Sequence, residues 1–138
     1  MRIMGLDVGT KNIGVALGDE TCTIAQAKGV VRREKDSQAI TCIVEILEEF
    51  DVKEIVVGLP IHMDGREGLR AEDSKNFAKK LQKKTGLPVH LWDERLSTKE
   101  MEDVLIKADV SRKKRKKVID KLAAQIILQG YLDCRQNR

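Results

Sequence analysis

The chain has 138 residues, of which 41% are hydrophobic and 35% are charged. These values are typical of a soluble globular protein, and we expect a single domain over residues 1–138. Because no run of eighteen apolar residues occurs and the N-terminus lacks a signal-peptide pattern, we expect a cytoplasmic protein without a membrane span. The cysteines, Cys22, Cys42 and Cys134, lack the spacing of a zinc site, so reduced thiols are expected.

The net charge is +4, and the positive charge is unevenly distributed. One run holds six consecutive cations: Arg112, Lys113, Lys114, Arg115, Lys116 and Lys117. Like charges in sequence repel unless a polyanion relieves them, so this run indicates contact with a phosphate backbone. A second group, Lys79, Lys80, Lys83 and Lys84, is interpreted equally well as a solvated helix face.

The first strand carries one acid in an otherwise apolar stretch. Residues 2–8 predict a strand, and residues 13–17 predict a second strand joined to it by a glycine-bearing turn. Alternation places Ile3, Gly5 and Asp7 on one face. Asp7 is interpreted either as a residue that caps the turn or as an acid held at the sheet to bind a metal.

The next elements complete a three-stranded meander and add a helix and a buried strand. Residues 21–32 predict the third strand, and a helix capped by Asp36 or Ser37 is expected to run to about residue 50. Residues 54–60 form a continuous apolar run, which is typical of a parallel strand buried on both faces.

The second half of the chain predicts three helices and one more strand. A helix over 71–85 stops at Gly86, and residues 89–92 predict a short strand. Ser97 and Glu100 fit a capping box for the next helix, which ends at 108–110. Ser111 is a candidate cap after that, and residues 118–132 form a buried helix with a broad apolar stripe. The sum is an α/β fold: a mixed five-stranded sheet, with three antiparallel strands and two parallel strands, flanked by about four helices.

Three acids lie at boundaries between apolar structure and polar ends: Asp7, Glu94 and Asp120, with Asp93 as a competitor for the second position. Clustered carboxylates repel one another and are tolerated mainly around a cation. Such hard oxygen ligands suit Mg²⁺ or Mn²⁺, which could activate water for phosphodiester cleavage. Taken singly, Asp120 also fits an acid near a helix N-terminus, and Glu94 fits a partner for Arg95.

The opening pattern Asp-x-Gly-Thr-x-x-x-Gly resembles the first phosphate loop of the actin, sugar-kinase and heat-shock ATPases. Those proteins enclose a nucleotide between two such domains, and 138 residues leave no room for a second one. A second resemblance, to the YqgF/RuvX family, spans essentially the whole chain. It rests on GLDVGTKNIGVA (5–16), IVVGLP (55–60), DG (64–65), WDERLST (92–98) and KVIDKLAAQIILQGYL (117–132).

This family is similar to RuvC-type Holliday-junction resolvases and is regarded as a nuclease that matures the 5′ end of pre-16S rRNA. The resemblance implies a ribonuclease H-like fold and makes Asp7, Glu94 and Asp120 the catalytic, metal-binding acids. One departure from RuvC is that the strand at 55–59 ends without an acid, so the second carboxylate must come from the end of the neighbouring strand.

The preferred hypothesis is a metal-dependent nuclease acting on structured RNA. The expected nucleic-acid contacts are Lys11, Arg95 and the six cations at 112–117, although Arg95 is favoured as a residue that neutralises the acids. The alternatives are a Holliday-junction resolvase on four-way DNA, or a non-catalytic module that binds nucleic acid or a transcription factor. We expect a monomer or homodimer, with ribosomal or transcription factors as candidate partners.

Overall fold

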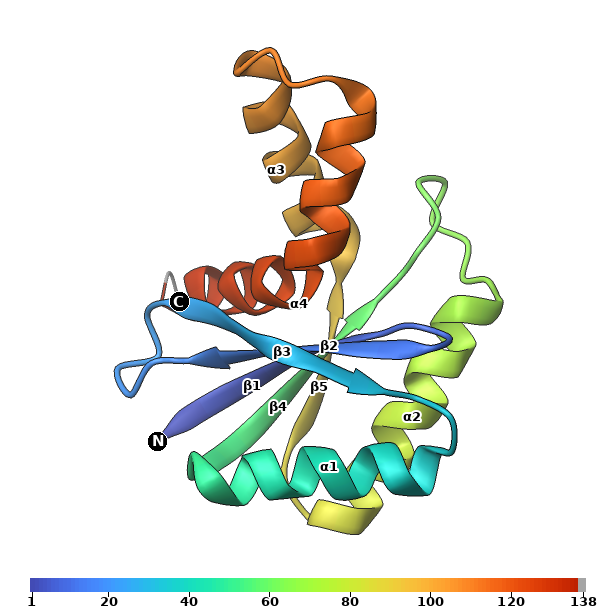
Figure 1. The fold of residues 1–138 in the computed structure, drawn as a ribbon, viewed down its shortest axis with the longest axis vertical. Helices are drawn as coiled ribbons and strands as arrows, with labels where there is room; N and C mark the ends of the chain where they lie inside the picture. Colours follow the sequence, from blue (N-terminus) through green and yellow to red (C-terminus); the bar gives the residue numbers. More distant parts are fainter. Residues whose placement is uncertain (137–138) are drawn as a thin grey trace.

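A five-stranded sheet in the order β3-β2-β1-β4-β5 forms the centre of the molecule (Figure 1). The computed structural model describes residues 1–136, with the side chains of all of these except 96–102, 120 and 121. The strands are β1 (Arg2–Val8), β2 (Asn12–Gly18), β3 (Ala25–Arg32), β4 (Val52–Leu59) and β5 (Val89–Asp93). The pairs β1–β2 and β2–β3 are antiparallel, whereas β1–β4 and β4–β5 are parallel. The predicted mixed sheet is therefore confirmed.

Helices cover both faces of this sheet. The helices are α1 (Asp36–Glu49), α2 (Leu69–Thr85), α3 (Glu94–Lys107) and α4 (Arg112–Gln136). On one face α1 and α2 close a core that includes Met4, Leu6 and Val8 of β1. On the other face α4 packs over β1 to β4 and buries Ile3. The alternation predicted for β1 is thus confirmed, and it places Asp7 on the α4 face.

Two predicted helix starts are wrong. Helix α1 is capped by Lys35, without a side-chain hydrogen bond, and not by Asp36 or Ser37 as predicted. The Asp36 carboxylate accepts hydrogen bonds from Arg33 and Lys80 instead. Helix α3 begins at Glu94, three residues before the predicted capping box. Asp93 takes the capping position there, and its carboxylate accepts the Arg95 backbone N–H at 3.0 Å. The side chains of the predicted box at 97–100 lie outside the described residues.

The third strand is shorter than expected. It begins at Ala25, because the Asp19 carboxylate folds the preceding residues into a turn by accepting the backbone N–H groups of Thr23 and Ile24. Those N–H groups are then unavailable to a strand ladder. The Thr21 hydroxyl donates to the Asp19 carboxylate and lowers the pKa of Asp19 to about 2, and the backbone hydrogen bonds from Ile24 and Thr23 add to this effect.

Helix α3 and the first part of α4 form an arm that projects from the body (Figure 1). The two helices pack against each other, and the rest of α4 turns and lies across the sheet. At the tip, the Val110 N–H donates to the Leu105 carbonyl and the Asp109 N–H donates to the Ile106 carbonyl, with Asp109 at φ +59°. This pattern closes the predicted end of the helix. Within the described residues, no helix is both long and apolar enough to cross a membrane.

Candidate active site

Two of the three acids named from the sequence meet at one edge of the sheet. Asp7 lies near the end of β1, and Glu94 follows the last residue of β5. The carboxyl ends of β1 and β5 lie at the same edge because β1, β4 and β5 are parallel. Burial raises the pKa of Glu94 and the nearby Asp7 carboxylate raises it further, so the two side chains lie close together. Two carboxyl groups this close repel each other when both are ionised, so the arrangement favours a proton, or a cation in its place.

A glycine on the intervening strand makes room for this pair. Gly58 of β4 lies opposite Trp92 in the sheet register. A Cβ atom on Gly58 would lie 2.5 Å from Glu94 Oε1 and would also clash with Ile127. The Glu94 carboxyl group therefore occupies the space that a side chain on β4 would fill. This explains how a strand that ends without an acid adjoins a two-carboxylate site.

The environment of Glu94 favours its neutral form. Burial raises the pKa of Glu94 to about 7, and the negative charge of Asp7 adds to the effect. Arg70, in the first turn of α2, opposes the shift through its positive charge. We did not predict Arg70 from the sequence, because it follows a stretch of mixed charge and is brought near Glu94 only by the fold.

The neighbouring Asp93 is engaged elsewhere. Arg95 donates to the Asp93 carboxylate from Nε at 3.1 Å and from Nη2 at 2.7 Å, and these bonds lower the pKa of Asp93. Arg95 also donates to the backbone carbonyl of His62 at 3.3 Å. Of the two adjacent acids, Glu94 is therefore the one that lies next to Asp7, whereas Asp93 forms an ion pair with Arg95.

The third acid, Asp120, falls on α4, and its side chain lies outside the described residues. Ala124, four residues further along the helix, lies close to the site. A Cβ on Gly14 would be 3.4 Å from the Ala124 Cβ and 3.6 Å from the Asp7 Cβ. Helix α4 thus passes beside Asp7, and the role of Asp120 stays a prediction.

The turn after Asp7 is held by Arg33, a residue that we did not single out in the sequence. Its guanidinium, only 10% exposed, donates to the Gly9 carbonyl at 3.0 Å and to both carboxylate oxygens of Asp73 at 2.6 and 2.8 Å. The Arg33 backbone N–H donates to the Lys11 carbonyl at 2.8 Å. One side chain thereby ties the turn to α2, and a further bond to Asp36 ties it to α1.

The predicted nucleic-acid contacts occupy two places. Lys11 is exposed on the turn that Arg33 holds, four residues after Asp7 in the sequence. The cations at 112–117 begin α4 and lie on the arm; all are exposed except Arg115, which donates to the Val110 carbonyl at 2.7 Å. Arg115 therefore helps to close the tip of the arm, whereas its neighbours present their charge to solvent.

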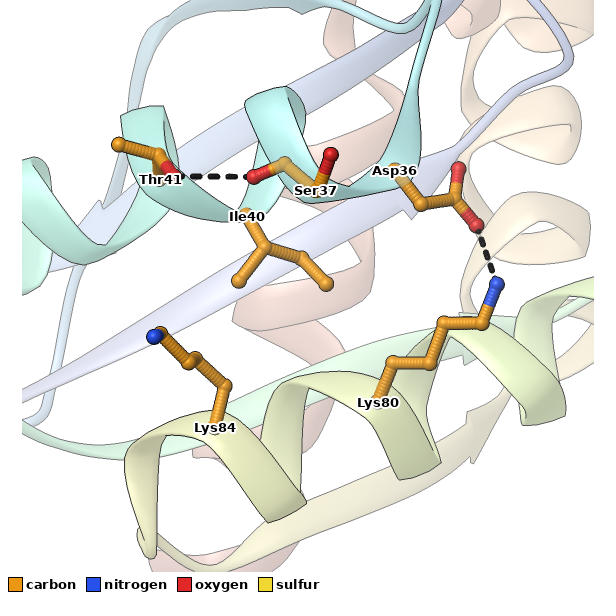
Figure 2. A pocket seen from close by; sticks show the side chains of 6 residues that line it. All are labelled: Asp36, Ser37, Ile40, Thr41, Lys80 and Lys84. Atoms are coloured by element: carbon orange, nitrogen blue, oxygen red, sulfur yellow. Dashed lines mark hydrogen bonds and ion pairs between the residues drawn. The ribbon is translucent and has the colours of Figure 1, made fainter.

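A separate pocket lies between α1 and α2, on the sheet face opposite α4 (Figure 2). Its volume is about 430 Å³, and its lining residues are Asp36, Ser37, Ile40, Thr41, Lys80 and Lys84. Lys80 donates to Asp36 at 2.8 Å. Two members of the Lys79–Lys84 group therefore line a pocket on the face away from Asp7 and Glu94, and one of them is neutralised within the protein.

The fold places the chain among the proteins that share the fold of RuvC. It aligns with the "Thermus thermophilus RuvC structure" with a TM-score of 0.59 at 15% identity, over 99% of this chain and 97% of that one. The sequence profile described as "RuvX: Holliday junction resolvase" matches residues 1–134. The chain therefore belongs to the RuvX family.

Relatives in this family are similar over nearly their whole length. A protein of Symbiobacterium thermophilum is 54% identical over 138 residues, covering 100% of this chain and 96% of that protein. A protein of Halothermothrix orenii is 53% identical over 133 residues, covering 96% of this chain and 95% of that protein. Both carry the name "Putative pre-16S rRNA nuclease".

Proposed function

We propose that this protein is a metal-dependent nuclease that hydrolyses phosphodiester bonds in structured RNA, with the 5′ end of pre-16S rRNA as the substrate that the names of its relatives suggest. The observation that carries the proposal is the close pair Asp7–Glu94 at the carboxyl edge of the parallel strands. A partly buried acid pair is unfavourable when both members are ionised, so its presence favours a chemical role.

The donor set of this pair fits a divalent metal. Asp7 and Glu94 offer carboxylate oxygens, which are the ligands that Mg²⁺ and Mn²⁺ prefer, and Asp120 is proposed as the third ligand. A bound ion would supply Lewis-acid stabilisation of the phosphate and an activated water. Glu94 must lose its proton for this, and its pKa of about 7 lets it do so near neutral pH.

The exposed cations are proposed to bind and orient the RNA. Lys11 is exposed on the turn that follows Asp7, and five exposed cations of the 112–117 run lie on the arm. Contacts of this kind release counterions, so affinity should fall steeply with salt and depend on backbone shape more than on sequence. Arg70, whose charge acts on Glu94, is placed to meet a phosphate at the acid pair.

The decisive experiment compares the parent protein with Asp7→Asn on a structured RNA carrying the pre-16S 5′ end. We expect Mg²⁺- or Mn²⁺-dependent cleavage by the parent and its loss in the variant, with RNA affinity retained. The matched control is Glu20→Gln, which removes an exposed acid outside the site. Cleavage by Asp7→Asn at the parent rate would show that the assignment of Asp7 is wrong.

A second candidate function is resolution of four-way DNA junctions, because the family profile is described as a Holliday junction resolvase. The same preparation should be tested on a four-way DNA junction and on the RNA. Faster cleavage of the junction would favour this alternative. Tight binding of either substrate without turnover under any divalent ion would favour a non-catalytic binding module.

A further inference from the structure

The edge strand β5 carries two ring side chains, His90 and Trp92, on the sheet face that α4 covers. The register pairs His90 with Val56 and Trp92 with Gly58. Val56 belongs to the core under α4, so His90 and Trp92 point to the α4 face, while Leu91 and Asp93 point to the α2 face. Helix α4 lies over β1 to β4, and β5 forms the edge of the sheet beyond them.

A third ring joins these two from α4. The Tyr131 ring lies between them, 5.7 Å from the His90 ring at an interplanar angle of 23° and 5.9 Å from the Trp92 ring at 87°. His90 is 44% exposed, and the other two are partly exposed. We call His90, Trp92 and Tyr131 the aromatic ledge. It contains the only tryptophan and the only tyrosine of the chain.

The aromatic ledge begins at the acid pair. Trp92 precedes Glu94 by two residues and lies opposite Gly58, the glycine that makes room for the Glu94 carboxyl group. Along a strand, His90 lies about 7 Å further out than Trp92. The two rings of β5 therefore extend from the acid pair along the open edge of the sheet, and the Tyr131 ring lies beside both of them.

Polar contacts with Glu54 hold the His90 and Tyr131 rings, and Arg135 neutralises the charge of Glu54. Glu54, whose side chain is 17% exposed, accepts a bond from the Tyr131 hydroxyl at 3.3 Å and lies 3.3 Å from His90 Nε2. Arg135 donates to the same carboxylate at 3.2 Å. Its charge offsets that of Glu54, so the ledge does not present an unpaired anion to a phosphate backbone.

We propose that the aromatic ledge is a stacking site for unpaired nucleotides of the substrate strand, next to the phosphodiester bond that the acid pair would cleave. The inference rests on the proposed function and deepens it by naming the substrate class. Every base has a π-face, so stacking on these rings tolerates any sequence. Bases inside a duplex already stack on each other, so the site selects a single-stranded segment adjoining structured RNA.

The single tryptophan makes the site directly observable. The Asp7→Asn protein, used to prevent turnover, is titrated with single strands of about twelve nucleotides, a length within the usual site sizes of single-strand binders. Fluorescence anisotropy of a dye on the strand reports binding, and intrinsic fluorescence reports Trp92. We expect single-stranded RNA to quench Trp92 in step with the anisotropy rise, and a blunt RNA duplex to bind without quenching. Single-stranded DNA of the same sequence should quench equally, because stacking does not read the sugar.

Variants separate stacking from general binding. Trp92→Ala should weaken the affinity for the single strand about tenfold, and Trp92→Phe, which keeps a ring, should restore most of it. The control is Leu91→Ala, which trims an exposed side chain on the other face of the same strand and should leave affinity unchanged. The duplex affinity of Trp92→Ala should match that of its parent, which also verifies that the variant is folded.

The outcomes distinguish this inference from the proposed function. Unchanged Trp92 fluorescence at saturating single strand, or an equal loss in Leu91→Ala, would overturn the ledge while leaving the nuclease proposal standing. Quenching together with absent cleavage by the parent protein would support the ledge and count against catalysis. A protein that binds neither single strand nor duplex would overturn both.

Discussion

Replacing Glu94 by Gln should stabilise the metal-free protein, and the gain should depend on pH. The pKa of Glu94 is about 7 in the folded protein against an ordinary value of 4.5. The group therefore holds its proton more tightly when folded, and the parent loses stability as pH rises from 4.5 to 7. This difference corresponds to about 3 kcal/mol, an upper bound because Glu94 is only partly buried and water screens its charge. Gln is neutral throughout and avoids the loss.

Urea denaturation in EDTA at pH 4 and pH 8 measures this effect. We expect parent and Glu94→Gln to have similar unfolding free energies at pH 4, and the variant to be the more stable at pH 8. The opposite-sign control is Asp93→Asn, measured at pH 2 as well: Arg95 lowers the pKa of Asp93 below its ordinary value of 3.8, so the stabilisation by Asp93 is present at pH 4 and pH 8 and is lost only as pH falls further. A free-energy difference between Glu94→Gln and its parent that does not change with pH would refute the reasoning.

Three further changes test the surroundings of the site. Arg33→Ala leaves Asp73 without its bidentate partner and should lower the free energy of unfolding by about 2 kcal/mol, because Asp73 is partly exposed and water screens its charge; urea titration measures it, and a loss below 1 kcal/mol would contradict the proposed bracing of the turn. Gly58→Ala should displace the carboxyl group above it and reduce the Mn²⁺-induced rise in melting temperature, and its clash with the buried Ile127 should also lower the metal-free melting temperature; an undiminished Mn²⁺-induced rise would show that the space is not needed. Replacing Lys113 and Lys114 by Ala should reduce the slope of log affinity against log salt by about 1.4 for single strands, measured by anisotropy; Lys107→Ala, which also removes an exposed charge from the arm, tests whether position within the run matters.

Local patterns were sufficient for most of the fold. Strict alternation in β1 placed Asp7 on one face with Ile3 and Gly5, and the unbroken apolar run of β4 identified a strand buried on both faces. Gly86 ends α2 as predicted, in the left-handed conformation at φ +71°. These features depend on neighbours in sequence, so a single sequence contains them.

The remaining features depend on contacts between distant residues. The Ser97 capping box competed with Asp93, which takes the cap because β5 delivers it directly to the helix start. The pairing of Arg33 with Asp73 joins positions forty residues apart, and only the packing of α2 on the sheet reveals it. Likewise, nothing in the sequence near Tyr131 indicates that it meets two rings of β5.

Glu94 is also the first residue of α3, and α3 is one half of the arm. A helix transmits motion along its axis because its backbone hydrogen bonds resist bending. Any displacement of the arm would therefore also move the Glu94 carboxyl group. The contacts of Arg95 with Asp93 and with the His62 carbonyl lie at the base of the arm and fix the first turn of α3 there. The cations that begin α4 and one acid of the pair are thus carried by the two packed helices of one arm.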